Sequence, residues 1–438
     1  MYVGRKGLTI PKSDLSAEVR KKIIGDLTFA PKQLYVPAPP FYCYRESENK
    51  LYLPRFYGGY QAPEQLPAPV RVAFEFKGGI RENQVPAAEA FLEAKCGLLE
   101  LPCGFGKTVI ALYIMARLGV KTLIIVHKEF LLQQWTERIQ EFLPGATIGL
   151  LRGGTVDTGK DITIGMLQSI SMKEYDPAVF AGIGLTIIDE THHVAAEVFS
   201  NALFKIVTPY MLGLSATMER ADGLTKVFKL FLGEIVFSAQ REKTDNVVVQ
   251  QVMFLSDDEK FNEVVLNFKG QAQYSVMINK LTDFAPRRAF LMRVLRTLVA
   301  TPQNRQIMVL SQTKSLLEDL HRDISQEGLA SVGYYVGGMK TAALKASEGN
   351  RIILATYAMA EEALDIKTLT TLLMATPKNN VTQAVGRILR VKHEQPLVVD
   401  IVDPHYTFTN QWKKRQTFYR GNNYTIVKYT SETYPVPK

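Results

Sequence analysis

The sequence predicts an α/β protein with two doubly wound parallel sheets in tandem, preceded by a small N-terminal accessory domain. Short apolar runs alternate with amphipathic segments over residues 79–237 and again over 301–405, and proline is concentrated before residue 79. Short uncharged runs separated by helices are typical of strands buried on both faces of a parallel sheet. A length of 438 residues suits two or three domains rather than one.

The first 78 residues are expected to form an accessory domain of short strands and turns. Nine of the 21 prolines lie there, and this density excludes long helices. One helix is expected from Ser13, a suitable N-cap residue, to Ile24.

The order of the remaining segments follows from their apolar runs. The first sheet is expected to use residues 97–101, 122–126, 162–164, 185–188 and 211–214, and the second 306–310, 333–336, 351–355, 371–375 and 397–402. Between them, residues 238–300 are charged at the start and helical at the end, which favours a connector or insertion. Residues 406–438 form a basic tail rich in aromatic side chains.

Composition limits the class of protein. An apolar content of 46% and a charged content of 22% are typical of a globular protein, and no uncharged apolar stretch is long enough to span a membrane. The net charge of +9 favours a polyanionic partner such as nucleic acid, although a membrane surface fits the charge alone almost as well. Three cysteines without CxxC spacing indicate neither a disulfide framework nor a zinc site, so we expect a cytoplasmic location, with the nucleus as the alternative.

A glycine-rich turn follows the first of these strands. Gly104 and Gly106 allow successive backbone N–H groups to face a phosphate, and the N-terminus of the next helix faces the same charge. Lys107 would reach the β- and γ-phosphates, and the Thr108 hydroxyl would bind Mg²⁺. Leu101 stands where the full pattern has glycine, so an ordinary strand–turn–helix junction is the alternative. The remaining predicted loop contacts are Pro102, Cys103 and Phe105.

A carboxylate pair follows the strand expected at 185–188. Asp189 would hold Mg²⁺ and Glu190 would orient the attacking water, because ligands of open α/β sheets bind at the carboxyl ends of the strands. A solvated acidic strand end is the alternative, and the nearby phosphate loop makes it less favoured. His192 and His193 do not predict a metal cluster, because adjacent side chains on an extended segment point apart; we assign His192 to coupling.

Further strings complete an ordered set of motifs at residues 81–84, 215–217, 355–356, 362–365 and 383–390. In this order they resemble the Q motif and motifs I, II, III, V and VI of superfamily 2 helicases, over about residues 79–405. The likeness is to the DExH-box XPB/UvsW-like group, of viral or phage type. It implies that both sheet domains are RecA-like and that ATP with Mg²⁺ is used.

The resemblance also implies roles for single residues. Arg81, Gln84 and Asp365 would contact the nucleotide, and Ser215, Ala216 and Thr217 would couple its state to the nucleic-acid groove. Gln383, Arg387 and Arg390 would reach the γ-phosphate from the second domain, although a basic helix face is the alternative for the arginines. Ala363 stands where motif V usually has glycine.

The predicted nucleic-acid contacts are Lys128, Gln168, Ser169 and Thr356, which would touch phosphates without reading sequence. The aromatic and basic residues at 51–60 and 406–420 fit either base stacking or simple packing. We therefore expect a monomeric, 3′-to-5′ DNA helicase or translocase acting on forked or branched DNA, with replication, recombination or transcription proteins as partners.

Three alternatives use the same residues. They are an RNA-acting or transcript-release helicase of a DNA virus, a motor partnered by a nuclease, and a nucleotide-gated clamp without turnover. Glu190 argues against the clamp, because a clamp needs no group that activates water.

Overall fold

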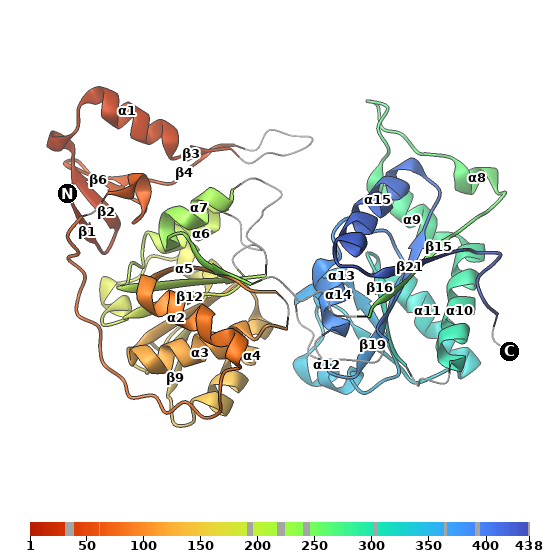
Figure 1. Ribbon diagram of the computed structural model, residues 1–438. Helices are drawn as coiled ribbons and strands as arrows, with labels where there is room; N and C mark the ends of the chain where they lie inside the picture. The colour runs from red at the N-terminus through yellow and green to blue at the C-terminus, as the bar shows by residue number, and fades with distance from the viewer. Residues whose placement is uncertain are drawn as a thin grey trace. The chain divides into compact units, whose positions relative to one another are not determined.

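The computed structural model shows two compact units, Met1–Arg241 and Glu242–Lys438, which we describe separately (Figure 1). It describes residues 1–30, 39–60, 62–102, 104–190, 196–216, 224–239, 246–301, 305–362, 366–389 and 395–436. Within these ranges, none of the helices is both long enough and apolar enough to cross a membrane.

The first unit begins with a small antiparallel sheet. Its strands run in the order β1 (Tyr2–Gly4), β2 (Gly7–Pro11), β6 (Lys50–Leu53) and β5 (Arg45–Glu46), and β3 (Thr28–Phe29) pairs with β4 (Phe41–Tyr42). Helix α1 spans Ala17–Asp26, and its cap is Ser16, whose hydroxyl accepts from Val19 N at 3.2 Å. The helix therefore starts later than Ser13, because Ser13 lies in a short 3₁₀ turn at Lys12–Asp14.

Backbone hydrogen bonds join this small sheet to the rest of its unit. Phe56 N donates to Leu230 O at 2.9 Å. The chain then runs along the larger domain, where Val70 N donates to Gly182 O and Lys77 N to Phe142 O, both at 2.8 Å. Residues 70–77, expected in the accessory domain, are thus bonded to the sheet domain that follows.

The large sheet of the first unit has eight strands in the order β10-β9-β11-β8-β12-β13-β7-β14, all parallel except for the β10–β9 pair. All the predicted strands of this sheet are confirmed. Three strands were not predicted: β10 and β14 are the two edge strands, and β9 lies between β10 and β11. The bounds are β7 Cys96–Glu100, β8 Thr122–Val126, β9 Ile148–Arg152, β10 Thr155–Val156, β11 Ile162–Met166, β12 Leu185–Ile188, β13 Tyr210–Ser215 and β14 Ile235–Ser238.

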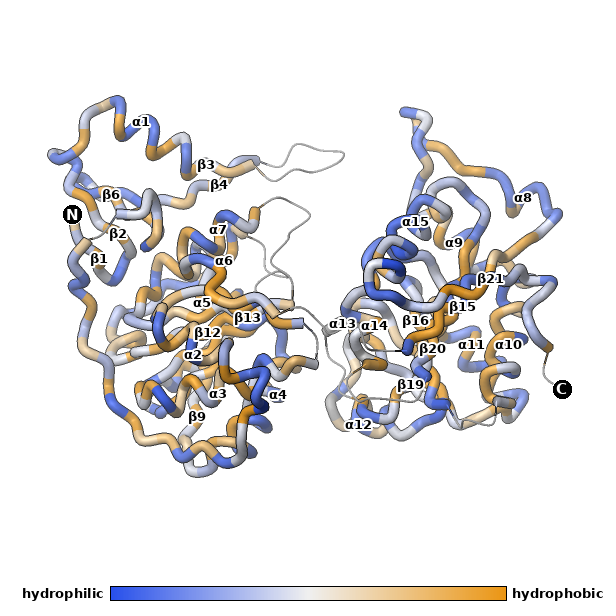
Figure 2. The backbone as a smooth tube through the Cα atoms, in the orientation of Figure 1, coloured by the Kyte–Doolittle hydropathy of each residue, from blue (hydrophilic) through white to orange (hydrophobic). Residues whose placement is uncertain are grey.

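Helices cover both faces of this sheet. Ile124 and Ile187 pack with helices α2, α3 and α4, whereas Ile125 and Ile188 pack with α5, α6 and α7. The central strands β12 and β13 are accordingly mostly apolar, as the tube in Figure 2 shows. The helices are α2 Val85–Ala94, α3 Lys107–Leu118, α4 Glu129–Phe142, α5 Leu167–Met172, α6 Ala196–Leu203 and α7 Thr225–Leu232.

The second unit contains a seven-stranded parallel sheet in the order β17-β18-β16-β19-β20-β15-β21. β15 lies between β20 and β21, so a segment expected in a connector belongs to this sheet. The strands are β15 Val248–Met253, β16 Gln306–Ser311, β17 Val332–Tyr335, β18 Ile352–Thr356, β19 Leu369–Met374, β20 Leu397–Val402 and β21 Thr425–Thr430. The helices are α8 Glu259–Asn262, α9 Tyr274–Asp283, α10 Ala285–Ala300, α11 Lys314–Glu327, α12 Thr341–Ser347, α13 Tyr357–Glu362, α14 Thr382–Ile388 and α15 Tyr406–Gly421.

The C-terminal segment is part of this second fold. Trp412 and Tyr419 of α15 are 6% and 0% exposed, and the Arg415 guanidinium of the same helix binds both carboxylate oxygens of Asp400 at 2.8 Å. Packing therefore accounts for these aromatic side chains, and the basic tail is a helix and a strand of the domain.

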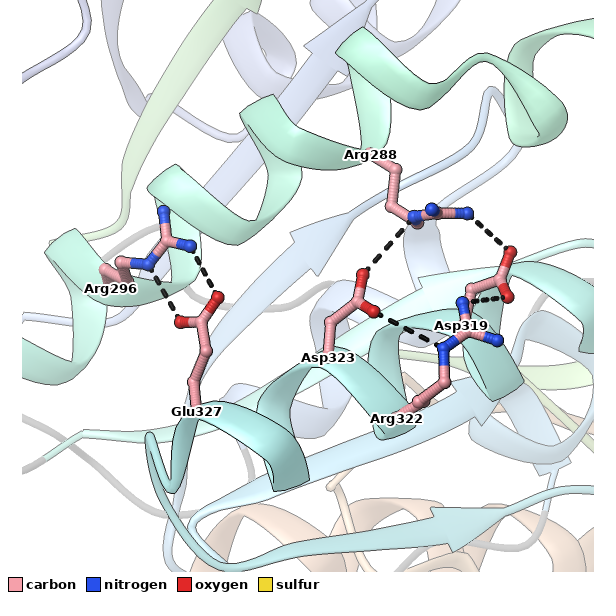
Figure 3. Close-up of polar contacts among 6 residues, drawn as sticks. All are labelled: Arg288, Arg296, Asp319, Arg322, Asp323 and Glu327. Atoms are coloured by element: carbon pink, nitrogen blue, oxygen red, sulfur yellow. Dashed lines mark hydrogen bonds and ion pairs between the residues drawn. The ribbon is translucent and has the colours of Figure 1, made fainter.

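Helix α10 is held on two sides. Arg287 is fully buried and binds the two Asp403 oxygens at 2.6 and 2.9 Å and Ala375 O at 2.8 Å. On the outer side, ion pairs join α10 to α11 (Figure 3): Arg288 meets Asp319 at 2.8 Å. These contacts fix the ends of β19 and β20, from which the chain continues to α14 and α15.

Candidate functional site

The predicted phosphate loop lies between β7 and α3. The backbone N–H of Leu101 donates to Ser215 O at 2.8 Å, and that of Phe105 to Pro102 O at 3.1 Å. Gly104 and Gly106 have φ values of 81° and 93°, which glycine adopts without strain. Leu101 is fully buried in the apolar core beside α3, and this explains a leucine where the pattern has glycine.

Arg81 and Gln84 hold the loop from outside. The Gln84 amide nitrogen donates to Phe105 O at 2.6 Å, while its carbonyl oxygen accepts from Arg81 N at 2.7 Å. The Arg81 guanidinium donates to Gly104 O at 3.2 Å. A Cβ on Gly106 would lie 2.3 Å from the Gln84 amide nitrogen, so this contact requires glycine. Both residues lie at the loop as expected, and their contact with a nucleotide stays a prediction.

The carboxylate pair directly follows β12 and meets the loop. Lys107 Nζ lies 2.8 Å from Glu190 Oε1. The Asp189 carboxylate accepts from Glu190 N through Oδ1 and from the Trp135 indole N–H through Oδ2, both at 2.9 Å. Glu190 has a φ of 51°, uncommon for a residue with a side chain, at the point where the chain leaves the sheet. The two strings recognised in the sequence are therefore in contact.

Burial controls the charge of this site. Asp189 is 7% exposed, and the pKa of its carboxyl is raised to about 6, mainly because the group is removed from water. This net value also includes the neighbouring Glu190 charge, which raises the pKa, and Lys107 and the Trp135 hydrogen bond, which lower it. A cation near Asp189 would favour its charged form.

The residues present fit ATP with Mg²⁺. Thr108 is half-buried in the first turn of α3, and with Asp189 it offers the oxygen ligands that Mg²⁺ prefers. Among the described residues no group of three or more His, Cys, Asp or Glu could hold a metal. A cation at this position would therefore need phosphate oxygens as further ligands, and it would neutralise part of the phosphate charge.

The predicted coupling residues lie beside the loop where the structure describes them. Ser215 ends β13 and is fully buried, with its carbonyl bonded to Leu101 N, and half-buried Ala216 follows. Five predicted site residues lie outside the described ranges, namely Cys103, His192, Thr217, Asp365 and Arg390.

Three of the predicted nucleic-acid contacts follow the neighbouring strands β8 and β11. Lys128 is the residue before α4, and the Gln168 amide nitrogen donates to His127 O at 3.0 Å. The Ser169 hydroxyl accepts from Gly153 N at 3.0 Å and keeps its own proton for donation. A hollow of about 440 Å³ lies here, lined by Glu129, Arg152, Gly153, Gly154, Thr155, Met166, Gln168 and Ser169.

The second unit carries the other predicted residues. Thr356 ends β18, and α14 carries Gln383, which is half-buried, and Arg387 one turn later. The side chain of Arg387 is not among those described, so its reach to a γ-phosphate stays a prediction.

Sequence reasoning missed Trp135. It lies in the amphipathic helix α4, where its ring is 1% exposed and resembles any core residue. The signal that could have found it is chemical, because a buried indole N–H needs an acceptor.

Comparisons with known proteins show which family the chain resembles. Residues 77–220 match the family described as "Type III restriction enzyme, res subunit". The chain is 32% identical over 459 residues to "Putative ATP-dependent RNA helicase L396" of Acanthamoeba polyphaga mimivirus, covering 98% of this chain and 86% of that protein. It is 24% identical over 381 residues to "Probable helicase D10" of Escherichia phage T5, covering 85% and 80%.

Two further likenesses are to another viral relative and to a solved structure. "Putative ATP-dependent RNA helicase QP509L" of African swine fever virus (isolate Tick/Malawi/Lil 20-1/1983) is 28% identical over 366 residues, with 77% of this chain and 71% of that protein covered. A crystal structure of T4 UvsW superposes with a TM-score of 0.37 at 16% identity, covering 95% of this chain and 96% of that one.

Proposed function

Because the chain belongs to the superfamily 2 helicases of viral and phage type and is an ATP-dependent helicase, we propose that it unwinds forked or branched DNA. We assign it 3′-to-5′ polarity and magnesium-dependent hydrolysis. The ATPase part of the proposal depends most on one observation, the 2.8 Å contact between Lys107 and Glu190 beside the buried Asp189.

The contact suggests how the chain's own groups would act. Lys107 is paired with Glu190. A triphosphate in the loop would attract the Lys107 ammonium, and the adjacent Glu190 carboxylate would orient the attacking water and accept its proton. Arg387 and Arg390 would supply positive charge from the second unit, so hydrolysis would depend on the approach of that unit.

Contacts with nucleic acid would be made largely to phosphates. Lys128 and the Ser169 hydroxyl are suited to this, since each can donate to a phosphate oxygen. Thr356 would make the corresponding contact from the second unit. Binding should then be independent of sequence and should weaken steeply as salt rises.

The N-terminal region of the first unit could offer a second surface to a branched substrate. Lys21 and Lys22 of α1 are exposed, and Tyr42 and Tyr60 are 50% and 45% exposed. Arg55 is excluded from this surface, because it is 8% exposed and its guanidinium donates to Thr208 O at 2.6 Å. Exposed tyrosines in a region that also carries exposed lysines could stack on bases that leave a duplex.

RNA unwinding is the second candidate function. It is favoured by the names of the mimivirus and African swine fever virus relatives, both of which are called RNA helicases. The phosphate contacts described above fit either nucleic acid, since phosphates are common to both.

A panel of substrates tests the proposal. Unwinding should be measured with ATP and Mg²⁺ on forked DNA, four-way junctions, RNA duplexes and RNA:DNA hybrids, each with 3′ or 5′ single-stranded tails. We expect forks and junctions to be opened from a 3′ tail, and a Glu190→Gln protein to open none. Activity on RNA duplexes alone would overturn the DNA assignment and favour the second candidate.

A further inference from the structure

Helix α4 contacts both parts of the candidate site in the first unit. Its first residue, Glu129, lines the hollow that also contains Gln168 and Ser169. Trp135, six residues later in the same helix, donates its indole N–H to Asp189. At 1.5 Å per residue these two positions are about 9 Å apart along the helix axis.

The Trp135 contact fixes the orientation of the Asp189 carboxylate. One oxygen accepts from Glu190 N and the other from Trp135, so donors at both ends define the plane of the group. Trp135 and Asp189 are 1% and 7% exposed, which leaves little water to replace a lost donor. A hydrogen bond to a charged acceptor in such surroundings is among the stronger ones.

The first residue of α4 makes an exposed ion pair with the neighbouring sheet. Glu129 forms an ion pair with Arg152 at the end of β9. The next residue, Gly153, donates its backbone N–H to the Ser169 hydroxyl. Nucleic acid entering the hollow would meet this ion pair, because Glu129 and Arg152 both line it. Its phosphate oxygens would then compete with the Glu129 carboxylate for Arg152.

We propose that Trp135 is a positioning residue for Asp189, and that α4 transmits nucleic-acid binding in the hollow to the ATP site through it. The second part rests on the proposed nucleic-acid contacts at Lys128 and Ser169. Phosphate binding at Arg152 releases Glu129, α4 shifts, and Trp135 changes the orientation of the carboxylate. In this way nucleic acid stimulates hydrolysis without touching the nucleotide.

If Trp135 had only a structural role, replacing it with phenylalanine should leave kcat unchanged. Its ring packs in the apolar cluster with Leu131 and Ile139, and phenylalanine would fill most of that space. Trp135→Phe therefore removes the N–H while keeping an aromatic ring. The matched control is Trp412→Phe, which changes the other tryptophan of the chain, buried in the second unit.

The first experiment compares steady-state ATPase in both variants with saturating single-stranded oligonucleotide. We expect Trp135→Phe to lower kcat about tenfold or more, with KM for ATP changed less than about twofold, since the lost bond orients a charged group. Trp412→Phe should keep the wild-type kcat. A normal kcat in Trp135→Phe overturns the positioning role. A fall in kcat that is fully explained by a lower unfolding temperature of the variant also overturns it.

The second experiment uses fluorescence, which does not depend on turnover. In the Trp412→Phe protein, Trp135 is the only tryptophan, and its emission should shift when oligonucleotide is added without ATP. Anisotropy of a labelled oligonucleotide reports binding separately. When Arg152→Gln is combined with Trp412→Phe, bound oligonucleotide should no longer shift the Trp135 emission.

The outcomes separate the two proposals. Binding without any emission change in the Trp412→Phe protein overturns transmission through α4. Failure of every oligonucleotide to bind contradicts the proposed nucleic-acid contacts themselves, and the kcat of Trp135→Phe measured without oligonucleotide still tests the positioning of Asp189.

Discussion

The buried ion pair of α10 makes a sharp prediction about the second unit. Arg287 and Asp403 are both 0% exposed and share two hydrogen bonds at 2.6 and 2.9 Å. Arg287→Ala leaves the carboxylate buried without its partner, which typically costs about 3–5 kcal/mol. For a unit of this size we expect the unfolding temperature to fall by about 6–20 °C.

The adjacent arginine is the matched control. Arg288 is 27% exposed, and its pairs with Asp319 and Asp323 lie on the surface between α10 and α11 (Figure 3). Arg288→Ala should therefore cost no more than about 1 kcal/mol, a fall of less than about 4 °C. Both changes are to alanine at neighbouring positions of one helix, so helix propensity does not distinguish them.

Thermal unfolding followed by Trp412 fluorescence in a Trp135→Phe background reports on the second unit alone. The double variant Arg287→Met with Asp403→Leu removes both charges, and it should recover most of the stability that Arg287→Ala loses. Equal losses in the two alanine variants would refute the reasoning, as would a double variant no more stable than Arg287→Ala.

Three further predictions concern the nucleotide loop, the second unit and the cysteines. Arg387→Ala should still bind ATP but lose about a thousandfold in nucleic-acid-stimulated kcat, and a wild-type rate would contradict an arginine supplied by the second unit. Gly106→Ala should weaken ATP binding in a filter or calorimetric assay, because the φ of Gly106 is 93° and the new Cβ would lie 2.3 Å from the Gln84 amide nitrogen. Gly25→Ala is the control and should leave ATP binding unchanged, because a Cβ there meets nothing within 4 Å. Burial raises the pKa of Cys43 to about 12 and also raises that of Cys96. At pH 8 neither is then a thiolate, so iodoacetamide should label these two cysteines only after unfolding in urea. Rapid labelling of Cys43 or Cys96 itself in the native protein would show that the burial is wrong.

Much of the fold could be predicted from local patterns. The buried parallel strands form short, mostly apolar runs, and the central strands of both sheets were predicted from these runs. β14 was missed because it pairs with β7 through an irregular register at the sheet edge. The position of β15 between β20 and β21 could not be predicted, because it depends on pairing with strands more than a hundred residues away.

The site residues likewise divide into those that local sequence motifs predict and those that depend on tertiary contacts. Lys107, Asp189 and Glu190 belong to strings whose residue types are tied to one chemistry, and the structure brings them together. Trp135 belongs to no such string, and its role depends on a contact 54 residues along the chain. The burial of Arg55 and Trp412 likewise depends on tertiary packing, which the aromatic and basic composition of their segments does not reveal.

The most direct test of the account is phosphate release by Lys107→Ala, measured with and without single-stranded DNA at saturating ATP and Mg²⁺. The loss of the ammonium beside Glu190 should reduce both rates to background while the unfolding temperature stays within a few degrees of wild type. DNA-stimulated hydrolysis in this variant at a rate comparable with wild type would contradict the assignment of the ATP site.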